Sequence, residues 1–228
     1  GIPAGMNITE EYIEKDLLRR MQGHGRGGRM KIEKDHAEIF SGVRHAITLG
    51  SPISLLIKNF DWVNWEDRMA TGKPKKEHRK VTMPRPGHAD LAGVMKYGLD
   101  DIRNVLERSS ARETAMRVAI GAVCRKLLEE VGITVGSRVY QIHNIVDDTP
   151  VSNNMSLKEL NDTVDASPVR CFDKAAEKKM MDVIDKARNN GDSVGGSFEV
   201  IAKGLPYGLG TYINADGKLQ ARISQAMM

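Results

Sequence analysis

The centre of the chain carries a long segment with almost no helix-breaking residues, residues 101–131, and this feature constrains the fold most. Small and branched apolar side chains recur there at helical spacing, so that they fall on one stripe. The stripe consists of Ala115, Val118, Ala119, Ala122, Val123 and Leu127. Such small side chains let a helix pack closely against another helix or a sheet. Together with a shorter helical segment at residues 89–97, this stripe predicts packed helices in the middle of the sequence.

Segments with a period near two flank these helices, as is typical of strands. Between residues 30 and 59 the alternation predicts a small antiparallel sheet. Its apolar positions are Met30, Ile32, Ala37, Ile39, Ile53, Leu55 and Ile57. Residues 133–145 and 195–206 are strand-like as well. Strands before and after a block of helices, rather than alternating with it, indicate an α+β fold and not a series of βαβ units.

Capping residues mark further helices. Thr9 can cap a helix over residues 9–22, Ser156 opens a capping box, and Asp173 can cap a longer helix. The apolar stripe of the first helix consists of Ile13, Leu17, Leu18 and Met21. A last helix begins at residue 218.

The composition excludes several classes of protein. With 40% apolar and 28% charged residues the chain has an ordinary globular composition. Its net charge of +4 is low for a nucleic-acid-binding protein, and no aromatic residues accompany the arginines to stack on bases. The longest apolar run is far shorter than the roughly 20 residues of a membrane span. We expect neither a nucleic acid nor a membrane as a partner.

The two cysteines, Cys124 and Cys171, lie in different segments, and no CxxC motif is present. We therefore predict no metal site and no disulfide framework, and we expect a reduced, cytoplasmic setting. The chain starts without Met or a signal-peptide pattern and ends inside an apparent helix, which indicates truncation at both ends.

A basic segment rich in proline and glycine, residues 71–87, has no periodicity and predicts a mobile surface loop. The functional alternative is an electrostatic lid.

The segment GHGRGGRM, residues 23–30, holds four glycines and two arginines. It lacks the Lys-Ser/Thr of a Walker motif, and a helix precedes it where the dinucleotide fingerprint needs a strand. Glycine nevertheless allows a close backbone approach to a ligand, and Arg26 and Arg29 offer forked donors for phosphate or carboxylate. A flexible turn with solvated arginines is the structural alternative.

Two further segments carry candidate site residues. In RPGHAD, residues 85–90, Asp90 either caps or charges the start of a helix beside an exposed His88, or it is the acid that assists His88 as a proton donor. In RSSARETAMR, residues 108–117, Arg108 and Arg112 lie four apart and would share a helix face. Like charges on one face repel each other unless an anion lies between them. Ser109 and Ser110 are poor helix-interior residues but good caps, and if the helix restarts there, its N-terminus would be an anion site. The alternative is an arginine face paired with glutamates.

Together these segments resemble chorismate synthase. The resemblance is carried by GHGRGGRMKIE at 23–33, SGVRHAITLGSPI at 41–53, RPGHADLAGVMKYG at 85–98, RSSARETAMRVAIGAV at 108–123, GDSVGG at 191–196 and GLPYGLGTY at 204–212. It covers essentially the whole chain, in order. It implies a single domain over residues 1–228, with a central helical layer between antiparallel sheets, that forms a homotetramer when complete.

The resemblance also implies an activity. Chorismate synthases convert 5-enolpyruvylshikimate 3-phosphate to chorismate by a 1,4-anti elimination of phosphate, the last common step of the shikimate pathway. They need reduced FMN without net redox change, and NADPH would serve only indirectly, to reduce the flavin.

Site residues follow from the matching positions. His88 would be catalytic and lie beside the flavin. Arg108, Ser109 and Ser110 would contact the flavin. The substrate would bind to Arg20, Arg26, Arg29, Arg85 and Arg112.

Features of the family are missing from the sequence at both ends. Family members begin with a Gly-Glu-Ser-His-Gly segment and continue past the present end with an Arg-x-Asp motif and a flavin loop. We therefore expect the chain alone to be inactive and to bind FMN weakly. An inactive anion- or flavin-binding fragment is the alternative to an active enzyme.

Overall fold

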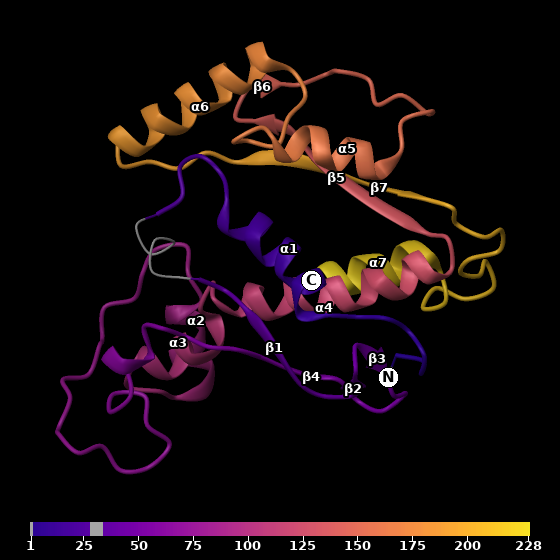
Figure 1. Cartoon of the computed structure of the whole chain (residues 1–228). Coiled ribbons are helices and arrows are strands. Elements are labelled where there is room, and N and C mark those ends of the chain that lie inside the picture. The colour runs from indigo at the N-terminus through magenta and orange to yellow at the C-terminus, as the bar shows by residue number, and fades with distance from the viewer. Residues whose placement is uncertain (1, 28–33) are drawn as a thin grey trace. The chain divides into compact units, whose positions relative to one another are not determined.

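The computed structural model describes residues 2–27 and 34–228. The chain forms two compact units, Gly1–Cys124 and Arg125–Met228. The elements of the first unit are α1 (Glu10–Met21), β1 (Ala37–Ser41), β2 (Val43–Arg44), β3 (Ile47–Thr48), β4 (Ser54–Ile57), a 3-10 helix (Trp62–Asn64), α2 (Asp90–Tyr97), α3 (Arg103–Ser109) and α4 (Glu113–Glu130), which continues into the second unit (Figure 1).

The core of the first unit joins α1, β1 and the first part of α4. Helix α1 begins where Thr9 Oγ1 accepts a hydrogen bond from the backbone N–H of Tyr12, as the capping signal predicts. The buried cluster comprises Ile8, Ile13, Leu17, Ala37, Ala119, Ala122 and Val123, which confirms the small-residue stripe of α4. Leu18 is 47% exposed, so its place on the α1 stripe was wrong. It lies about 100° around the helix from Leu17 and misses the core.

The predicted small antiparallel sheet is confirmed by β1 and β4. Ala37 lies opposite Ile57, and Ile39 lies opposite Leu55. The alternation proposed for Met30 and Ile32 falls outside the described residues.

A hairpin that the sequence did not reveal follows β1. Strands β2 and β3 pair antiparallel around a two-residue turn of His45 and Ala46, with φ of 51° and 62°. Two positive φ values in succession define the turn type whose twist suits a tight hairpin. Glycine or asparagine normally marks such a turn, and neither occupies these positions.

The second unit places two helices on one face of a sheet. Its elements are β5 (Thr134–Ile142), β6 (Ile145–Val146), α5 (Leu157–Asp165), α6 (Lys174–Asn189), β7 (Gly196–Lys203) and α7 (Leu219–Met227). The strands are all antiparallel, in the order β6-β5-β7. Helix α5 packs against Gly136 near one end of β5, and α6 packs beside Ile142 at its other end. Figure 1 shows both helices on the same side of the sheet.

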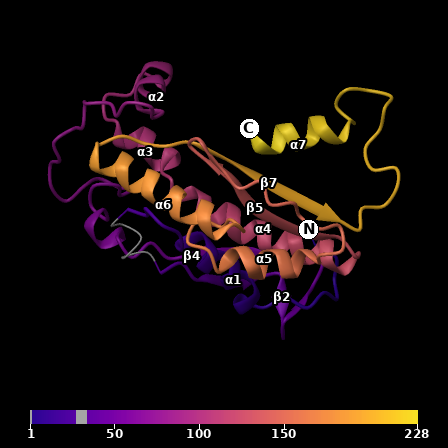
Figure 2. The same ribbon diagram turned by 90° about the horizontal axis from the view of Figure 1, so that it is seen from above.

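The helix ends of the second unit confirm the sequence signals. Ser156 accepts a hydrogen bond from the N–H of Glu159 at the start of α5, and Asp173 accepts one from Ala175 at the start of α6. After β7 an irregular stretch leads to α7, which begins close to the predicted residue (Figure 2).

The segment 71–87 has no helix or strand, as predicted, and carboxylates hold it at several points. Asp67 accepts the backbone N–H groups of Lys75 and Lys76 and also contacts His78 Nε2 at 2.8 Å. Further along, Asp101 accepts the N–H of Val81. The mobility of this loop stays a prediction.

Candidate functional site

The carboxylate of Asp35 is buried, and two arginines from separate elements of the first unit converge on it. Arg20, near the end of α1, donates from Nη1 to Asp35 Oδ2 over 2.8 Å. Arg112, just before α4, donates from Nη1 to Asp35 Oδ1 over 2.5 Å. Each carboxylate oxygen thus accepts a charge-assisted hydrogen bond, the stronger kind. We call Arg20, Asp35 and Arg112 the Asp35 cluster.

Each guanidinium of the Asp35 cluster has a second anchor. Arg20 Nε and Nη2 donate to Thr114 Oγ1 over 3.3 and 3.1 Å, and Arg112 Nη2 donates to the carbonyl of Lys58 over 2.8 Å. The two side chains are only 13% and 15% exposed. Both guanidinium groups are therefore held in fixed orientations, and the guanidinium is the side-chain group whose geometry suits phosphate and carboxylate groups.

A break in the helical centre places Arg112 in this cluster. Helix α3 ends at Ser109, Ser110 is extended with ψ of 137°, and α4 begins at Glu113. Residues 101–131 therefore do not form one helix, and the restart that the sequence offered as an alternative is confirmed. Arg108 and Arg112 do not share a helix face, contrary to the prediction.

The first three amides of α4 are already paired and not open to an anion. The N–H groups of Glu113, Thr114 and Ala115 donate to the carbonyls of Ser110, Ala111 and Arg112, respectively. The predicted alternative of an arginine–glutamate pair holds for Arg117, whose Nε lies 3.0 Å from Glu113 Oε2. A ligand at this break would therefore meet side chains rather than a free helix end.

The second charged cluster is local in sequence. Asp90 opens α2 and is fully buried, and Arg85 donates to its carboxylate from Nε, Nη2 and the backbone N–H over 2.8, 2.9 and 2.9 Å. The hydrogen bonds from Arg85 hold the pKa of Asp90 well below its usual value, although burial acts in the opposite direction. The same contacts raise the pKa of Arg85. We call Arg85, His88 and Asp90 the Asp90 cluster.

His88 is oriented by this carboxylate. Its Nδ1 lies 2.6 Å from Asp90 Oδ1 and 3.1 Å from Arg85 Nη2. An ionised carboxylate only accepts, so a proton on His88 Nδ1 satisfies the shorter contact. The other ring nitrogen, Nε2, is then the atom that can exchange a proton with a ligand.

The structure describes only part of the segment at residues 23–30, which we call the Gly-Arg loop. Arg26 is exposed, and its Nε donates to the carbonyl of Gln22 over 2.9 Å. Arg29 lies outside the described residues. The structure thus places neither arginine against the Asp35 cluster.

The predicted flavin-contacting residues surround the break before α4. Arg108 is exposed and pairs with none of the described residues. Ser109 Oγ donates to the carbonyl of Val105 over 2.9 Å, and Ser110 Oγ accepts the N–H of Arg112. Arg108 and the Ser110 hydroxyl hydrogen can therefore donate to an anionic group, whereas the Ser109 hydroxyl hydrogen is already committed.

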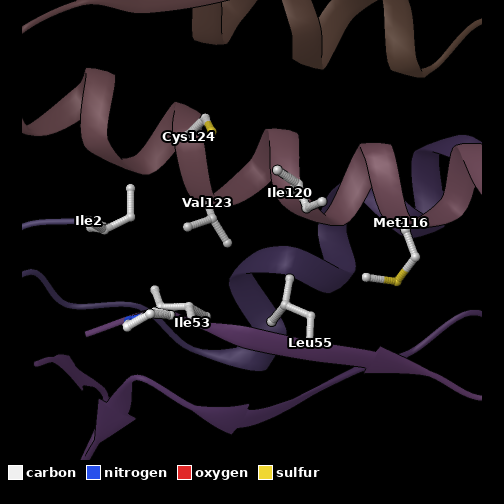
Figure 3. A pocket seen from close by; sticks show the side chains of 8 residues that line it. Ile2, Ile53, Leu55, Met116, Ile120, Val123 and Cys124 are labelled. Atoms are coloured by element: carbon white, nitrogen blue, oxygen red, sulfur yellow. The ribbon is translucent and has the colours of Figure 1, made fainter. Parts of the chain in front are cut away.

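A hollow of about 520 Å³ in the first unit lies between α4 and β4 (Figure 3). Its walls are Ile2, Pro52, Ile53, Leu55, Met116, Ile120, Val123 and Cys124. None of these side chains is charged. An apolar hollow does not suit a multiply charged ligand, so the candidate site is the pair of charged clusters instead.

Sequence reasoning missed Asp35 altogether. Its partners lie 15 and 77 residues away, and no local spacing connects them. Asp90 was noticed only as an acid beside His88 and as a charge at the start of a helix, although its place five residues after Arg85 and two after His88 was the available signal.

Comparison with known proteins assigns the family. The family model described as chorismate synthase matches residues 1–228. The chain belongs to the chorismate synthase family. The resemblance seen in the sequence motifs is thereby confirmed.

Curated chorismate synthases are similar over the whole chain. "Chorismate synthase 2" of Bacillus cereus (strain ZK / E33L) is 52% identical over 233 aligned residues, and the "Chorismate synthase" of Geobacillus sp. (strain WCH70) is 52% identical over 231. That of Listeria welshimeri serovar 6b is 49% identical. In each case the match covers 100% of this chain and 59% of the relative.

A solved structure supports the fold. The protein titled "Crystal Structure of Chorismate Synthase" matches with a TM-score of 0.78 and 39% identity, over 100% of this chain and 59% of that one. The α+β fold is thus confirmed, while the order of its layers stays a prediction. In the described part of the chain, no helix combines the length and apolar character that a membrane span requires.

Proposed function

We propose that this chain forms the substrate-binding and proton-transferring part of a chorismate synthase. The reaction would be the 1,4-anti elimination of phosphate from 5-enolpyruvylshikimate 3-phosphate. The observation that carries the proposal is the pair of Arg20 and Arg112 held around the buried Asp35. A substrate with a phosphate and two carboxylates needs such forked cationic donors, which bind these groups in a fixed orientation.

The other arginines would complete the binding of the anionic groups. Arg26 and Arg29 would close over the substrate from the Gly-Arg loop, and Arg85 would contribute from the Asp90 cluster. Because Arg85 is 50% exposed, its guanidinium can contact a ligand while Asp90 keeps it in place.

His88 would move a proton at Nε2. Asp90 fixes the ring through Nδ1, so the opposite nitrogen faces the reacting groups with a defined orientation. Reduced FMN, when bound, would supply the electron density that the elimination needs. NADPH would act only indirectly, by reducing the flavin.

The residues near the helix break fit an anionic cofactor group in part. Arg108 is exposed, and Ser110 keeps a hydroxyl hydrogen to donate. These two would hold FMN. Ser109 would lie beside the cofactor without donating a hydrogen bond to it, because its hydroxyl already donates to the carbonyl of Val105. We further propose a homotetramer in the cytoplasm as the working form.

The test is turnover by the product of the complete reading frame that encodes this chain, called the full-length protein below. We expect it to form chorismate and phosphate under anaerobic conditions with photoreduced FMN, and to show no turnover with oxidised FMN. Absence of turnover with reduced FMN would refute the proposal. If the reading frame is longer than 228 residues, the 228-residue chain assayed beside it should be inactive and bind FMN weakly.

A further inference from the structure

We propose that Asp35 is a positioning residue that sets the geometry of the anion-binding pair Arg20 and Arg112. The inference rests on the proposed function, because it concerns how that substrate site is held. Asp35 would not touch the substrate. It would act through the two guanidinium groups.

The geometry favours this role. Asp35 gives one oxygen to each arginine, at 2.8 and 2.5 Å, and so ties the end of α1 to the start of α4. Its own backbone is fixed, since its N–H lies 3.3 Å from Met21 Sδ. A carboxylate held in this way leaves each guanidinium little freedom, and the lost side-chain entropy is then not a cost of ligand binding.

Two guanidinium groups this close repel each other unless a negative charge lies between them. Asp35 supplies that charge before any ligand arrives. Without it, the arginines would separate or turn toward solvent, and the site would have to be assembled during binding.

A different role for Asp35 makes the opposite prediction. If it merely neutralised the arginines, it would compete with an anionic ligand, and its removal would tighten anion binding. Coulomb interactions fall with distance, and a ligand on the outer side of the guanidinium groups lies farther from Asp35 than they do. Removal of Asp35 would therefore weaken anion binding by freeing the arginines more than it would strengthen binding by ending the repulsion between Asp35 and the ligand.

The experiment uses Asp35→Asn in the full-length protein. Loss of a charge-assisted hydrogen bond corresponds to roughly 10- to 100-fold in binding, so KM for the substrate should rise by about that factor while kcat changes little. The Kd for inorganic phosphate, measured by calorimetry, should rise as well. Asp35→Glu keeps the charge on a longer arm and should give KM and Kd values between those of wild type and Asp35→Asn.

The matched control is Asp147→Asn. Asp147 is as buried as Asp35, but it accepts backbone N–H groups, among them those of Thr149 and Phe172. We expect this variant to lower Tm and leave KM unchanged. The inference is overturned if Asp35→Asn behaves like this control, or if it lowers the Kd for phosphate. If Asp35→Asn does not fold, a KM and a phosphate Kd of Asp35→Glu equal to those of wild type overturn it.

Failure of the proposed function gives a separate result. In that case the wild-type protein shows no turnover, and the phosphate Kd of the variants still tests the role of Asp35.

Discussion

The Asp35 and Asp90 clusters share one feature, a buried carboxylate that orients neighbouring side chains, but the side chains differ. In each, a buried carboxylate holds arginine or histidine side chains in place. Asp35 holds two largely buried arginines that come from distant parts of the chain, whereas Asp90 holds a half-exposed arginine and a histidine within five residues. This difference indicates that the two clusters have different functions. A pair of fixed charges suits binding, and a histidine with a fixed tautomer suits proton transfer.

The largest effect should come from the proton-transfer side. We expect His88→Ala in the full-length protein to lower kcat by roughly 10²- to 10⁴-fold, the usual contribution of general acid–base catalysis, with little change in substrate Kd. Anaerobic steady-state kinetics and calorimetry check this. Equal losses in kcat and affinity would mean that His88 only positions the substrate.

Asp90→Asn should affect the same step less strongly. The amide can donate to His88 Nδ1 as well as accept from it, so the ring loses its fixed tautomer. We expect kcat to fall by up to about 100-fold, the lower end of what acid–base catalysis contributes. The change should fall mainly on kcat, in contrast to the KM effect of Asp35→Asn. A pure KM effect in Asp90→Asn would remove the distinction between the two clusters.

Arg26→Ala tests a binding arginine outside both clusters. Its only hydrogen bond within the described residues runs to the carbonyl of Gln22, so its removal should disturb the fold little. We expect KM to rise by about tenfold, the low end for a charge-assisted contact at an exposed site. An unchanged KM would count against a phosphate-binding role for the Gly-Arg loop.

The sequence predicted what depends on near neighbours. The caps Thr9, Ser156 and Asp173 act within three residues, and each was predicted from its local pattern. RPGHAD likewise placed His88 beside an acid, although it did not show that Arg85 would bind the same carboxylate.

What depends on distant contacts was missed. Asp35 has no local pattern because its partners come from α1 and the start of α4. The break at Ser110 was foreseen only as an alternative, a helix restart at Ser109 and Ser110, because serine is a poor residue for a helix interior but no proline marks the break. Here Arg112 bonds to Asp35 and to the carbonyl of Lys58, which favours the break over a continuous helix.

The smallest expected effect concerns acid stability. Because Arg85 lowers the pKa of Asp90 in the folded state, the unfolded chain takes up a proton first as pH falls below about 4, the usual value for aspartate. The stability that Asp90 contributes is therefore fully present near neutral pH and declines with falling pH. In urea unfolding, the midpoint difference between wild type and Asp90→Asn should shrink between about pH 5 and pH 3.

The control for this titration is Ser156→Ala, which removes a helix cap that carries no charge. Its midpoint difference from wild type should stay nearly constant over the same pH interval, because no group that titrates there is lost. If the Asp90→Asn difference also stayed constant, Arg85 would not be lowering the pKa of this carboxylate. The Asp90 cluster would then be held by packing more than by charge. The two clusters would differ in the interaction that stabilises them as well as in function.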